Sequence, residues 1–216
     1  MSEQVSFKAE DGFEVVGSFY KSTSDTGVIL LHMLNRNRSD WNAFAGQLNK
    51  EGYNVLSIDL RGHGQSLKKG GRTVEWQTFS AKDFNDMILD VKAAKEFLEQ
   101  KGISKISLIG ASIGANIALN YATEDIEIKT TVLLSPGLDY RGVKIDDNVR
   151  DYGNRPMLIV ASEDDEYSAT SSKTMSESAA GKKELKIYAD AGHGTKMFSN
   201  TDLDKVIVNW LEQYGN

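Results

Sequence analysis

A serine placed between two glycines is the first feature of this 216-residue sequence that could do chemistry. Gly110-Ala111-Ser112-Ile113-Gly114 follows a short β-branched apolar run and precedes an Ala/Ile/Leu run, which predicts a strand, a sharp turn and a helix. Such a turn is crowded two residues before and two residues after its centre, where the two glycines have no side chain. It would hold the serine hydroxyl clear of a sheet and beside the N–H groups of a helix start. Gly-x-Ser-x-Gly also occurs by chance, and the flanking strand and helix patterns favour the nucleophile.

A serine nucleophile needs a base, and the sequence has three histidines, each of which follows a predicted strand. We expect His193 to be the base, because it lies between two glycines on a late loop where its ring can turn into the site. His32 and His63 lie in turn sequences in which a histidine often hydrogen-bonds to the backbone. The alternative for His193 is an ordinary histidine on a surface loop.

A serine–histidine pair also needs an acid, which fixes the imidazole tautomer and stabilises the imidazolium. Four acidic residues at positions 163–166 follow the predicted strand at 157–160. Asp139, after the predicted strand at 131–134, is an outside candidate. The residues themselves leave the partner of the histidine open, and most of the acidic cluster is expected to be solvated.

Composition excludes several other functions. The net charge of −6 and the lack of a lysine/arginine cluster argue against nucleic acid or an anionic membrane as a partner. Without cysteine there is no disulfide, thiolate metal site or thiol nucleophile. The first residues lack the basic and apolar regions of a secretory signal, and no apolar run approaches the ~20 residues that span a bilayer. We therefore expect a cytoplasmic protein with one domain over residues 1–216.

The elements that must position these residues alternate between apolar runs and segments of helical periodicity. This alternation predicts an α/β fold with a mostly parallel, eight-stranded sheet flanked by helices, and the active site at the carboxyl ends of the strands. The predicted strands are residues 5–10, 13–21, 28–31, 54–58, 106–109, 131–134, 157–160 and 185–188. The predicted helices include one after Ser39-Asp40, a long one from Ser80 to Gly102, one after Ser112, one over 169–180, and one capped by Thr201-x-x-Asp204.

Taken together, these motifs resemble the α/β-hydrolase superfamily over essentially the whole chain, and in particular its capless esterases of the dienelactone-hydrolase-like and carboxylesterase branch. The matching segments are Leu31-His32-Met33-Leu34, the run from Asp59 to Ser66, Gly110 to Gly114, Ser162 to Asp165, and Gly192-His193-Gly194. Their order of nucleophile, acid and histidine is the order of that superfamily. Its Gly-x-x-Asp pattern falls on Ser162-Glu163-Asp164-Asp165, so the resemblance implies Asp165 as the acid. A serine nucleophile departs from the cysteine of dienelactone hydrolases.

The resemblance also implies an oxyanion hole and no metal or organic cofactor. The expected donors are the backbone N–H of Ile113 and, from the loop after the third strand, that of Leu34. Met33 stands where the family has glycine, so the second donor is open between Met33 and Leu34. The turn that holds His63 is mostly architectural in this family.

The expected activity is hydrolysis of a carboxylic ester through an acyl-enzyme. Only about twenty residues lie between Leu134 and Pro156, too few for a cap domain, which predicts an open site and small or short-acyl ester substrates. Tyr140 and Arg141 could overhang that site, and a loop arginine, Arg36 or Arg38, could pair with a substrate carboxylate, although solvated arginines are the commoner case. A thioesterase, lysophospholipase or peptidase could use the same residues, and a catalytically silent binding module is the alternative from another class.

Overall fold

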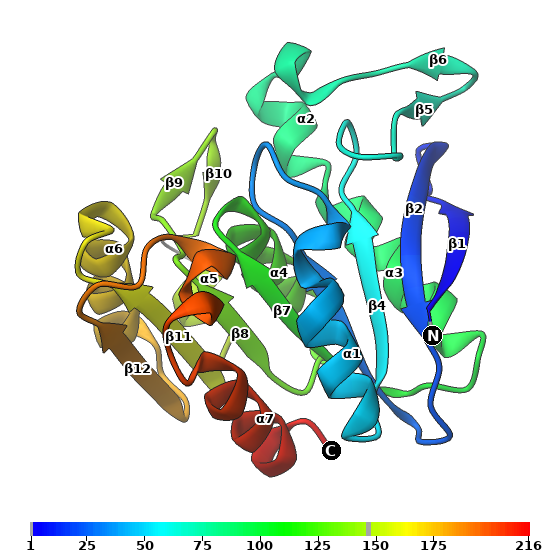
Figure 1. Ribbon diagram of the computed structural model, residues 1–216. Coiled ribbons are helices and arrows are strands. Elements are labelled where there is room, and N and C mark those ends of the chain that lie inside the picture. The colour runs from blue at the N-terminus through cyan, green and yellow to red at the C-terminus, as the bar shows by residue number, and fades with distance from the viewer. Residues whose placement is uncertain (1, 146–147) are drawn as a thin grey trace.

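The computed structural model describes residues 2–145 and 148–216, which form one mostly parallel sheet with helices on both faces (Figure 1). The strand order is β12-β11-β8-β7-β3-β4-β2-β5-β6, with β1 beside β2. Pairs from β12 through to β4 are parallel, and the pairs that involve β1, β2, β5 and β6 are antiparallel. The main strands are β1 (Glu3–Lys8), β2 (Phe13–Tyr20), β3 (Thr26–Leu31), β4 (Asn54–Asp59), β7 (Lys105–Ala111), β8 (Thr131–Leu134), β11 (Met157–Ser162) and β12 (Lys183–Tyr188).

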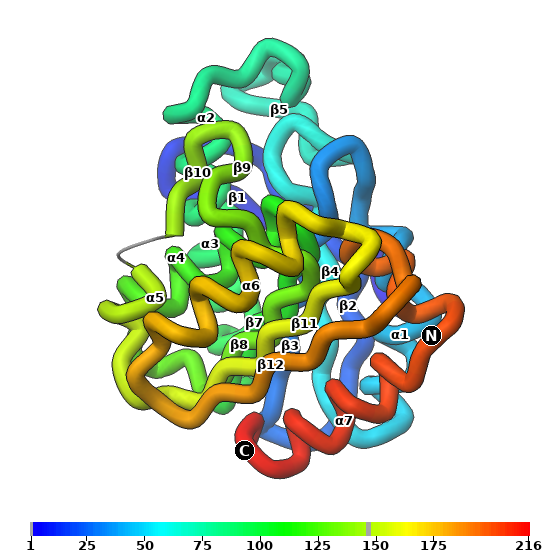
Figure 2. Tube along the Cα trace, turned by 90° about the vertical axis from the view of Figure 1, so that its left-hand side faces the viewer, coloured from blue at the N-terminus to red at the C-terminus, as the bar shows by residue number. Residues whose placement is uncertain are grey.

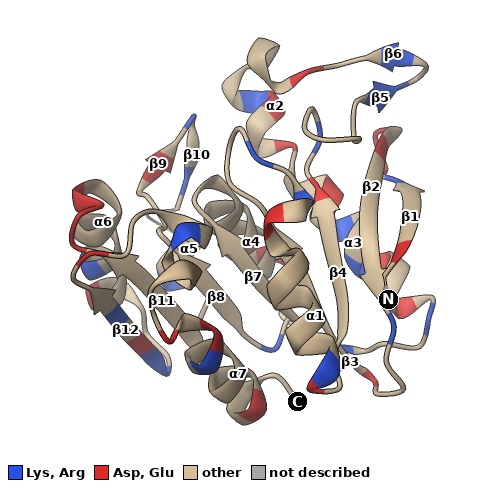
Figure 3. Ribbon diagram, viewed as in Figure 1, with Lys and Arg blue, Asp and Glu red and all other residues tan. Residues whose placement is uncertain are grey.

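These eight strands confirm the predicted mostly parallel α/β sheet, and β1 and β2 form an antiparallel hairpin. Two strands of two residues each, β5 (Lys68–Lys69) and β6 (Arg72–Thr73), extend the same sheet to ten strands and were not predicted. They lie at the tip of an exposed excursion, where Lys68, Lys69 and Arg72 are basic (Figure 3). Strands this short carry no alternation that a sequence pattern could reveal.

The sheet is buried on both faces because its central strands are apolar throughout. Successive residues point to opposite faces, so Ile29 and Leu31 pack on one side of the sheet and Val28 and Leu30 on the other. The first side is covered by α2 (Ala81–Asn85), α3 (Ile88–Glu99), α4 (Ile113–Glu124), α5 (Asn148–Asp151) and α6 (Glu166–Ser178). The second side is covered by α1 (Asn42–Lys50) and α7 (Leu203–Tyr214).

The prediction of one long helix from Ser80 was wrong. The capping box of Ser80 and Asp83 is present, but the helix breaks between α2 and α3. At the break, Met87 N–H donates to Phe84 O at 3.3 Å, which is a tighter turn than the α-helical one. The apolar stripe continues across the break because Phe84 and Met87 are both buried, so periodicity could not reveal it.

Two predicted helix starts also differ from the structure. Helix α6 begins at Glu166 rather than near 169, with Asp165 at its N-cap. In α7, the N-cap is Asp202, and Thr201 does not pair with Asp204 as a capping box would require. The Thr201 hydroxyl instead accepts a hydrogen bond from Leu203 N–H at 3.2 Å.

The segment between β8 and β11 (Met157–Ser162) is short. Its described residues form the hairpin of β9 (Asp139–Tyr140) and β10 (Val143–Lys144), and then α5. The tip of this hairpin lies against α2, as Figure 2 shows. Asn85 Nδ2 donates to Gly142 O at 3.0 Å, which joins two segments that are far apart in the sequence.

Candidate active site

Ser112 lies at the turn between β7 and α4, at the carboxyl edge of the sheet. Its φ of 55° and ψ of −124° are strained for a residue with a side chain. The structure compensates with a backbone hydrogen bond, because Ser112 N–H donates to Leu134 O in the neighbouring strand at 2.8 Å. Ser112 is only 6% exposed, although it lies at the apex of the turn.

Gly110 and Gly114 are where the turn leaves no room for a side chain. A Cβ on Gly110 would lie 2.1 Å from Gly114 O, and a Cβ on Gly114 would lie 2.6 Å from Leu31 O. Both contacts are with main-chain atoms, which cannot move aside without disturbing the sheet. The two glycines therefore bring the start of α4 against the end of β3.

Asp165 and His193 are brought together by two loops at the same edge. Asp165 follows β11 and His193 follows β12, and His193 Nδ1 lies 2.6 Å from Asp165 Oδ2. Burial acts to raise the pKa of Asp165, but hydrogen bonds from His193 and Ser168 outweigh burial and hold that pKa below its ordinary value. The pair therefore keeps a carboxylate beside the imidazole.

Asp164 has a different role from its neighbour. Its Oδ1 accepts hydrogen bonds from Gly192 N–H at 3.2 Å and Ala191 N–H at 3.3 Å, and Ser162 Oγ also donates to it. These contacts fix the loop that carries His193. Asp164 therefore binds the backbone of the loop, and Asp165 binds the imidazole.

Ser112 and His193 lie on two segments that are far apart in the sequence but pack against each other in the fold. Gly194 packs against Ala111, since a Cβ on Gly194 would lie 3.4 Å from Ala111 Cβ. Gly194 N–H also donates to Ser135 Oγ at 2.9 Å. In residues 2–145 and 148–216, no hydrogen bond joins Ser112 Oγ to the His193 ring, so the structure pairs two of the three predicted residues and places the third at the same edge.

The predicted oxyanion donors come from two different segments of the chain. Ile113 is the first residue of α4, and Leu34 lies in the loop after β3. Across the part of the chain that the structure describes, no protein acceptor pairs with the backbone N–H of Ile113, Leu34 or Met33. All three groups are therefore available to a negatively charged oxygen.

His32 and His63 are structural. His32 Nδ1 donates to Met33 O at 2.7 Å, and its Nε2 accepts from Leu60 N–H at 3.0 Å, which defines a neutral tautomer. His63 is buried and stacked on the Trp76 ring at 5.5 Å. Burial lowers the pKa of His32, and it lowers the pKa of His63 to about 4. Neither can serve as a base exposed to a substrate.

The two loop arginines are already paired with carboxylates. Arg36 makes two 2.7 Å bonds to Asp40, and Arg38 binds the buried carboxylate of Asp59. Arg38 N–H also donates to Asp59 Oδ1 at 2.7 Å, which fixes the loop after β3 to the end of β4. A substrate carboxylate would have to compete with these internal partners.

Tyr140 lies beside the Asp165–His193 pair. Its hydroxyl lies 2.8 Å from Ser168 Oγ and donates to Ser135 O at 3.2 Å, and its ring lies edge-on to the His193 ring at 6.4 Å. The sequence indicated only that Tyr140 could overhang the site. The sequence did not indicate a role for Ser135 and Ser168, because no motif predicts that two serines so far apart in the chain both contact the Tyr140 hydroxyl.

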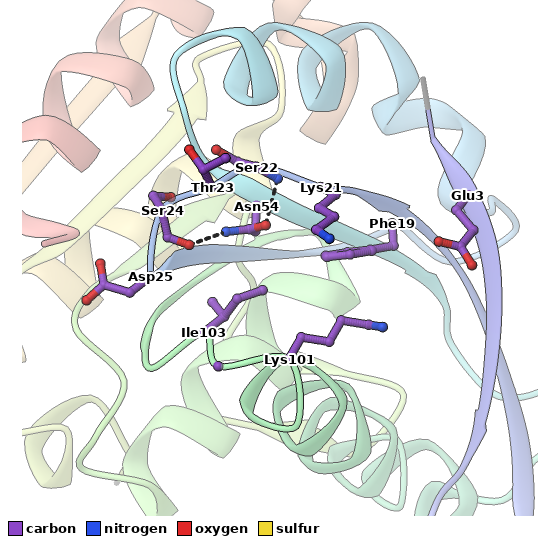
Figure 4. A pocket seen from close by; sticks show the side chains of 11 residues that line it. Glu3, Phe19, Lys21, Ser22, Thr23, Ser24, Asp25, Asn54, Lys101 and Ile103 are labelled. Atoms are coloured by element: carbon purple, nitrogen blue, oxygen red, sulfur yellow. Dashed lines mark hydrogen bonds between the residues drawn. The ribbon is translucent and has the colours of Figure 1, made fainter.

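A spacious surface cavity lies away from Ser112. It measures about 620 Å³ and is lined by Phe19, Asn54, Lys101 and Ile103, with loop residues (Figure 4). It lies at the opposite end of the sheet, since β3 begins beside it and Ser112 follows the other end of the parallel strand β7. The Asn54 amide there accepts from Ser22 N–H at 2.7 Å and donates to Ser24 O at 2.9 Å, and none of the predicted catalytic residues lines this cavity.

Two further observations concern the described residues only. They contain no group of three or more His, Asp or Glu side chains arranged to hold a metal ion. None of the helices in residues 2–145 and 148–216 is both long and apolar enough to cross a membrane.

Known proteins resemble this chain in sequence and in fold. The family described as serine aminopeptidase, S33, matches residues 22–151, which include Ser112 and end before Asp165. No curated protein matches the chain. Among solved structures, an esterase from Pyrococcus furiosus is 20% identical with a TM-score of 0.82, covering 100% of this chain and 93% of that one.

Two more solved structures cover both chains almost completely. An esterase domain of a Rhodothermus marinus protein is 19% identical with a TM-score of 0.77, covering 100% of both chains. A dienelactone hydrolase from Anabaena variabilis is 18% identical with a TM-score of 0.75, covering 100% of this chain and 99% of that one. At these identities the likeness concerns the fold.

Proposed function

This chain belongs to the serine aminopeptidase S33 family of the α/β-hydrolase superfamily, and from that premise we propose that it is a serine esterase acting on small or short-acyl carboxylic esters. The observation that carries the proposal is the 2.6 Å hydrogen bond between His193 Nδ1 and Asp165, formed beside the strained turn that presents Ser112. With its proton on Nδ1, the imidazole has a free lone pair on Nε2, which is what a general base needs.

The reaction would begin with attack of Ser112 Oγ on the ester carbonyl carbon, while His193 Nε2 takes the hydroxyl proton. The carbonyl oxygen becomes an oxyanion, which the N–H groups of Ile113 and Leu34 stabilise. His193 then gives its proton to the leaving alcohol, and an acyl-enzyme remains on Ser112. A water molecule activated by His193 releases the acid and restores the enzyme.

The size of the substrate follows from what surrounds Ser112. The described residues between β8 and β11 form only a hairpin and the short helix α5, so little structure exists there to enclose a long chain. Burial of each further methylene of a substrate needs apolar surface to receive it. We therefore place the preference at short acyl groups, such as acetate and butyrate.

The test compares the native protein with Ser112→Ala on p-nitrophenyl esters from acetate to laurate. We expect turnover that is highest for short esters and falls by at least about 10³-fold in Ser112→Ala. Ser104→Ala, an exposed serine just before β7, is the matched control and should behave as the native protein. Equal activity in Ser112→Ala and the native protein would refute the assignment of the nucleophile.

Parallel assays on a p-nitrophenyl thioester and on amino-acid p-nitroanilides separate the esterase from a thioesterase and a peptidase. Amide hydrolysis faster than ester hydrolysis would favour the peptidase reading that the family description suggests. Absence of turnover on all three classes would favour a binding module.

A further inference from the structure

The hairpin after β8 is fixed to the rest of the protein on three sides. From α4, Asn116 Nδ2 donates to Gly137 O at 2.7 Å and to Val143 O at 2.9 Å. From α2, Asn85 Nδ2 donates to Gly142 O at 3.0 Å. A segment held by three hydrogen bonds from two helices is a fixed part of the site and not a mobile lid.

The third side of the hairpin is fixed by Tyr167, on α6. The Tyr167 hydroxyl accepts from Asp139 N–H at 2.9 Å and donates to Asp139 O at 3.0 Å. Its ring meets the Tyr140 ring edge-on at 5.6 Å. Gly137 allows both rings to approach, because a Cβ there would lie within 2.7 Å of each of them.

This frame leaves the Tyr140 side chain in one orientation, directed at the site. Its hydroxyl contacts Ser168 and Ser135, and its ring faces His193. Ser135 directly follows Leu134, whose carbonyl oxygen accepts a hydrogen bond from Ser112 N–H. The Tyr140 hydroxyl therefore binds the residue next to the one that holds the backbone of Ser112. Burial raises the pKa of Tyr140 to about 12, while hydrogen bonding by Ser168 and Ser112 opposes the rise.

Ser112 is itself little exposed to solvent. A serine at the apex of a turn with no cap domain above it would be open to solvent, yet Ser112 is only 6% exposed. In an acyl-enzyme, the acyl group is attached to Ser112 Oγ and must occupy the space around that atom. The fixed Tyr140 ring lies 6.4 Å from the ring of His193, the base expected to serve this serine, so it would limit how long the acyl group can be.

We propose that Tyr140 is the specificity-determining residue of the acyl site, where its ring closes the space beside Ser112 and restricts the substrate to a short acyl chain. This inference rests on the proposed function, and it goes further by assigning the chain-length limit to one side chain. The ring carries the effect, and the hydroxyl holds the ring in place through Ser168 and Ser135.

The experiment measures kcat/KM for p-nitrophenyl acetate, butyrate, octanoate and laurate with the native protein, Tyr140→Ala and Tyr140→Phe. In Tyr140→Ala we expect the ratio of octanoate to acetate to rise by about 10-fold or more, since one or a few methylenes that gain a binding pocket change kcat/KM by this order. Tyr140→Phe keeps the ring and should keep the native ratio within about 3-fold. Unchanged ratios in Tyr140→Ala would overturn the proposal.

A second series varies the alcohol and keeps the acyl group as acetate. If Tyr140→Ala relaxes the preference for the alcohol and leaves the acyl profile unchanged, the ring lines the leaving-group side and the acyl assignment is wrong. Thermal unfolding checks that each variant folds, and Tyr140→Leu replaces the alanine variant if that one does not.

Labelling by alkyl fluorophosphonates separates this proposal from the proposed esterase activity, because these probes react with an activated serine whatever its natural substrate. Intact mass gives the labelling rate for ethyl and dodecyl probes. Faster dodecyl labelling of Tyr140→Ala than of the native protein supports the limit that Tyr140 sets on chain length, even if no ester is turned over. Equal labelling rates refute this role of Tyr140 and leave the proposed ester hydrolysis unaffected. Failure of every probe to label Ser112 overturns both proposals.

Discussion

The side-chain amide of Asn116 binds both main-chain groups of Gly137: Nδ2 donates to Gly137 O at 2.7 Å, and Oδ1 accepts from Gly137 N–H at 3.2 Å. Asn116 lies on α4, one turn after Ser112, and it is completely buried. The helix that begins at the nucleophile therefore also positions the hairpin that carries Tyr140. The positions of Ser112 and of Tyr140 therefore both depend on α4.

The first prediction concerns Asn116→Ala. This change leaves the buried carbonyl groups of Gly137 and Val143 without their donor, and each unpaired buried group costs about 1–3 kcal/mol. We expect the free energy of unfolding to fall by roughly 2–4 kcal/mol in urea titrations. The octanoate-to-acetate ratio should move in the direction expected for Tyr140→Ala, because the hairpin loses its main support.

Asn120→Ala is the matched control on the same helix. Asn120 is half-buried, and its Nδ2 donates to Lys144 O at 3.0 Å near the end of the hairpin. Partial exposure lets water replace the lost bond, so we expect a loss of only about 1 kcal/mol or less. Equal losses of stability in the two variants would contradict the role given to Asn116.

The fold could be predicted from the sequence because its signals are local. The buried runs of β3 and β8 consist of consecutive apolar residues, and the turn at Ser112 requires glycines at fixed offsets. These are short-range steric and hydrophobic patterns, and the structure places them where the pattern indicated. The same patterns failed at the break between α2 and α3, where an unbroken apolar stripe hides a change in backbone geometry.

The surroundings of the site depend on contacts between distant residues, which no spacing reveals. Arg38 pairs with Asp59, and Gly194 donates to Ser135, across long stretches of chain. Tyr140 is fixed by Tyr167 from a different helix. Each of these pairs exists because the sheet order brings their loops to one edge, so they follow from the topology rather than from the local sequence.

The second prediction separates Asp165 from the rest of its acidic cluster. In Asp165→Asn, the carboxylate that accepts a hydrogen bond from His193 Nδ1–H is replaced by an amide, so the imidazole loses the partner that fixes its tautomer. We expect kcat on p-nitrophenyl acetate to fall by about 10⁴-fold with little change in KM, by analogy with the same substitution in other triads. Steady-state kinetics and circular dichroism would be measured together.

Glu163→Gln provides the control for that change. Glu163 is exposed and lies two residues before Asp165, so its substitution removes the same charge from the same loop. Its kinetics should match those of the native protein within about 2-fold, since an exposed charge is screened by solvent. A comparable loss of activity in both variants would mean that the loop's overall charge, and not the Asp165–His193 bond, matters.

The third prediction is an acid-dependent loss of stability caused by His63. Burial lowers the pKa of His63 to about 4 in the folded protein, against an ordinary value of 6.5. Between these values the unfolded chain binds more protons than the folded one, so the free energy of unfolding falls as the pH decreases from 6.5 towards 4. The contribution is fully present above pH 6.5, and its size is at most about 3 kcal/mol for a shift of this extent.

His63→Phe keeps the ring stacked on Trp76 and removes the titration. Urea unfolding of both proteins at pH 7.0, 5.5 and 4.5 gives the difference between them, in which the contributions of titrating groups far from position 63 cancel and the joint effect of His63 and the adjacent His32 remains. We expect the native protein to lose stability relative to His63→Phe as the pH falls, whereas parallel curves over this range would show that His63 is not buried in its neutral form.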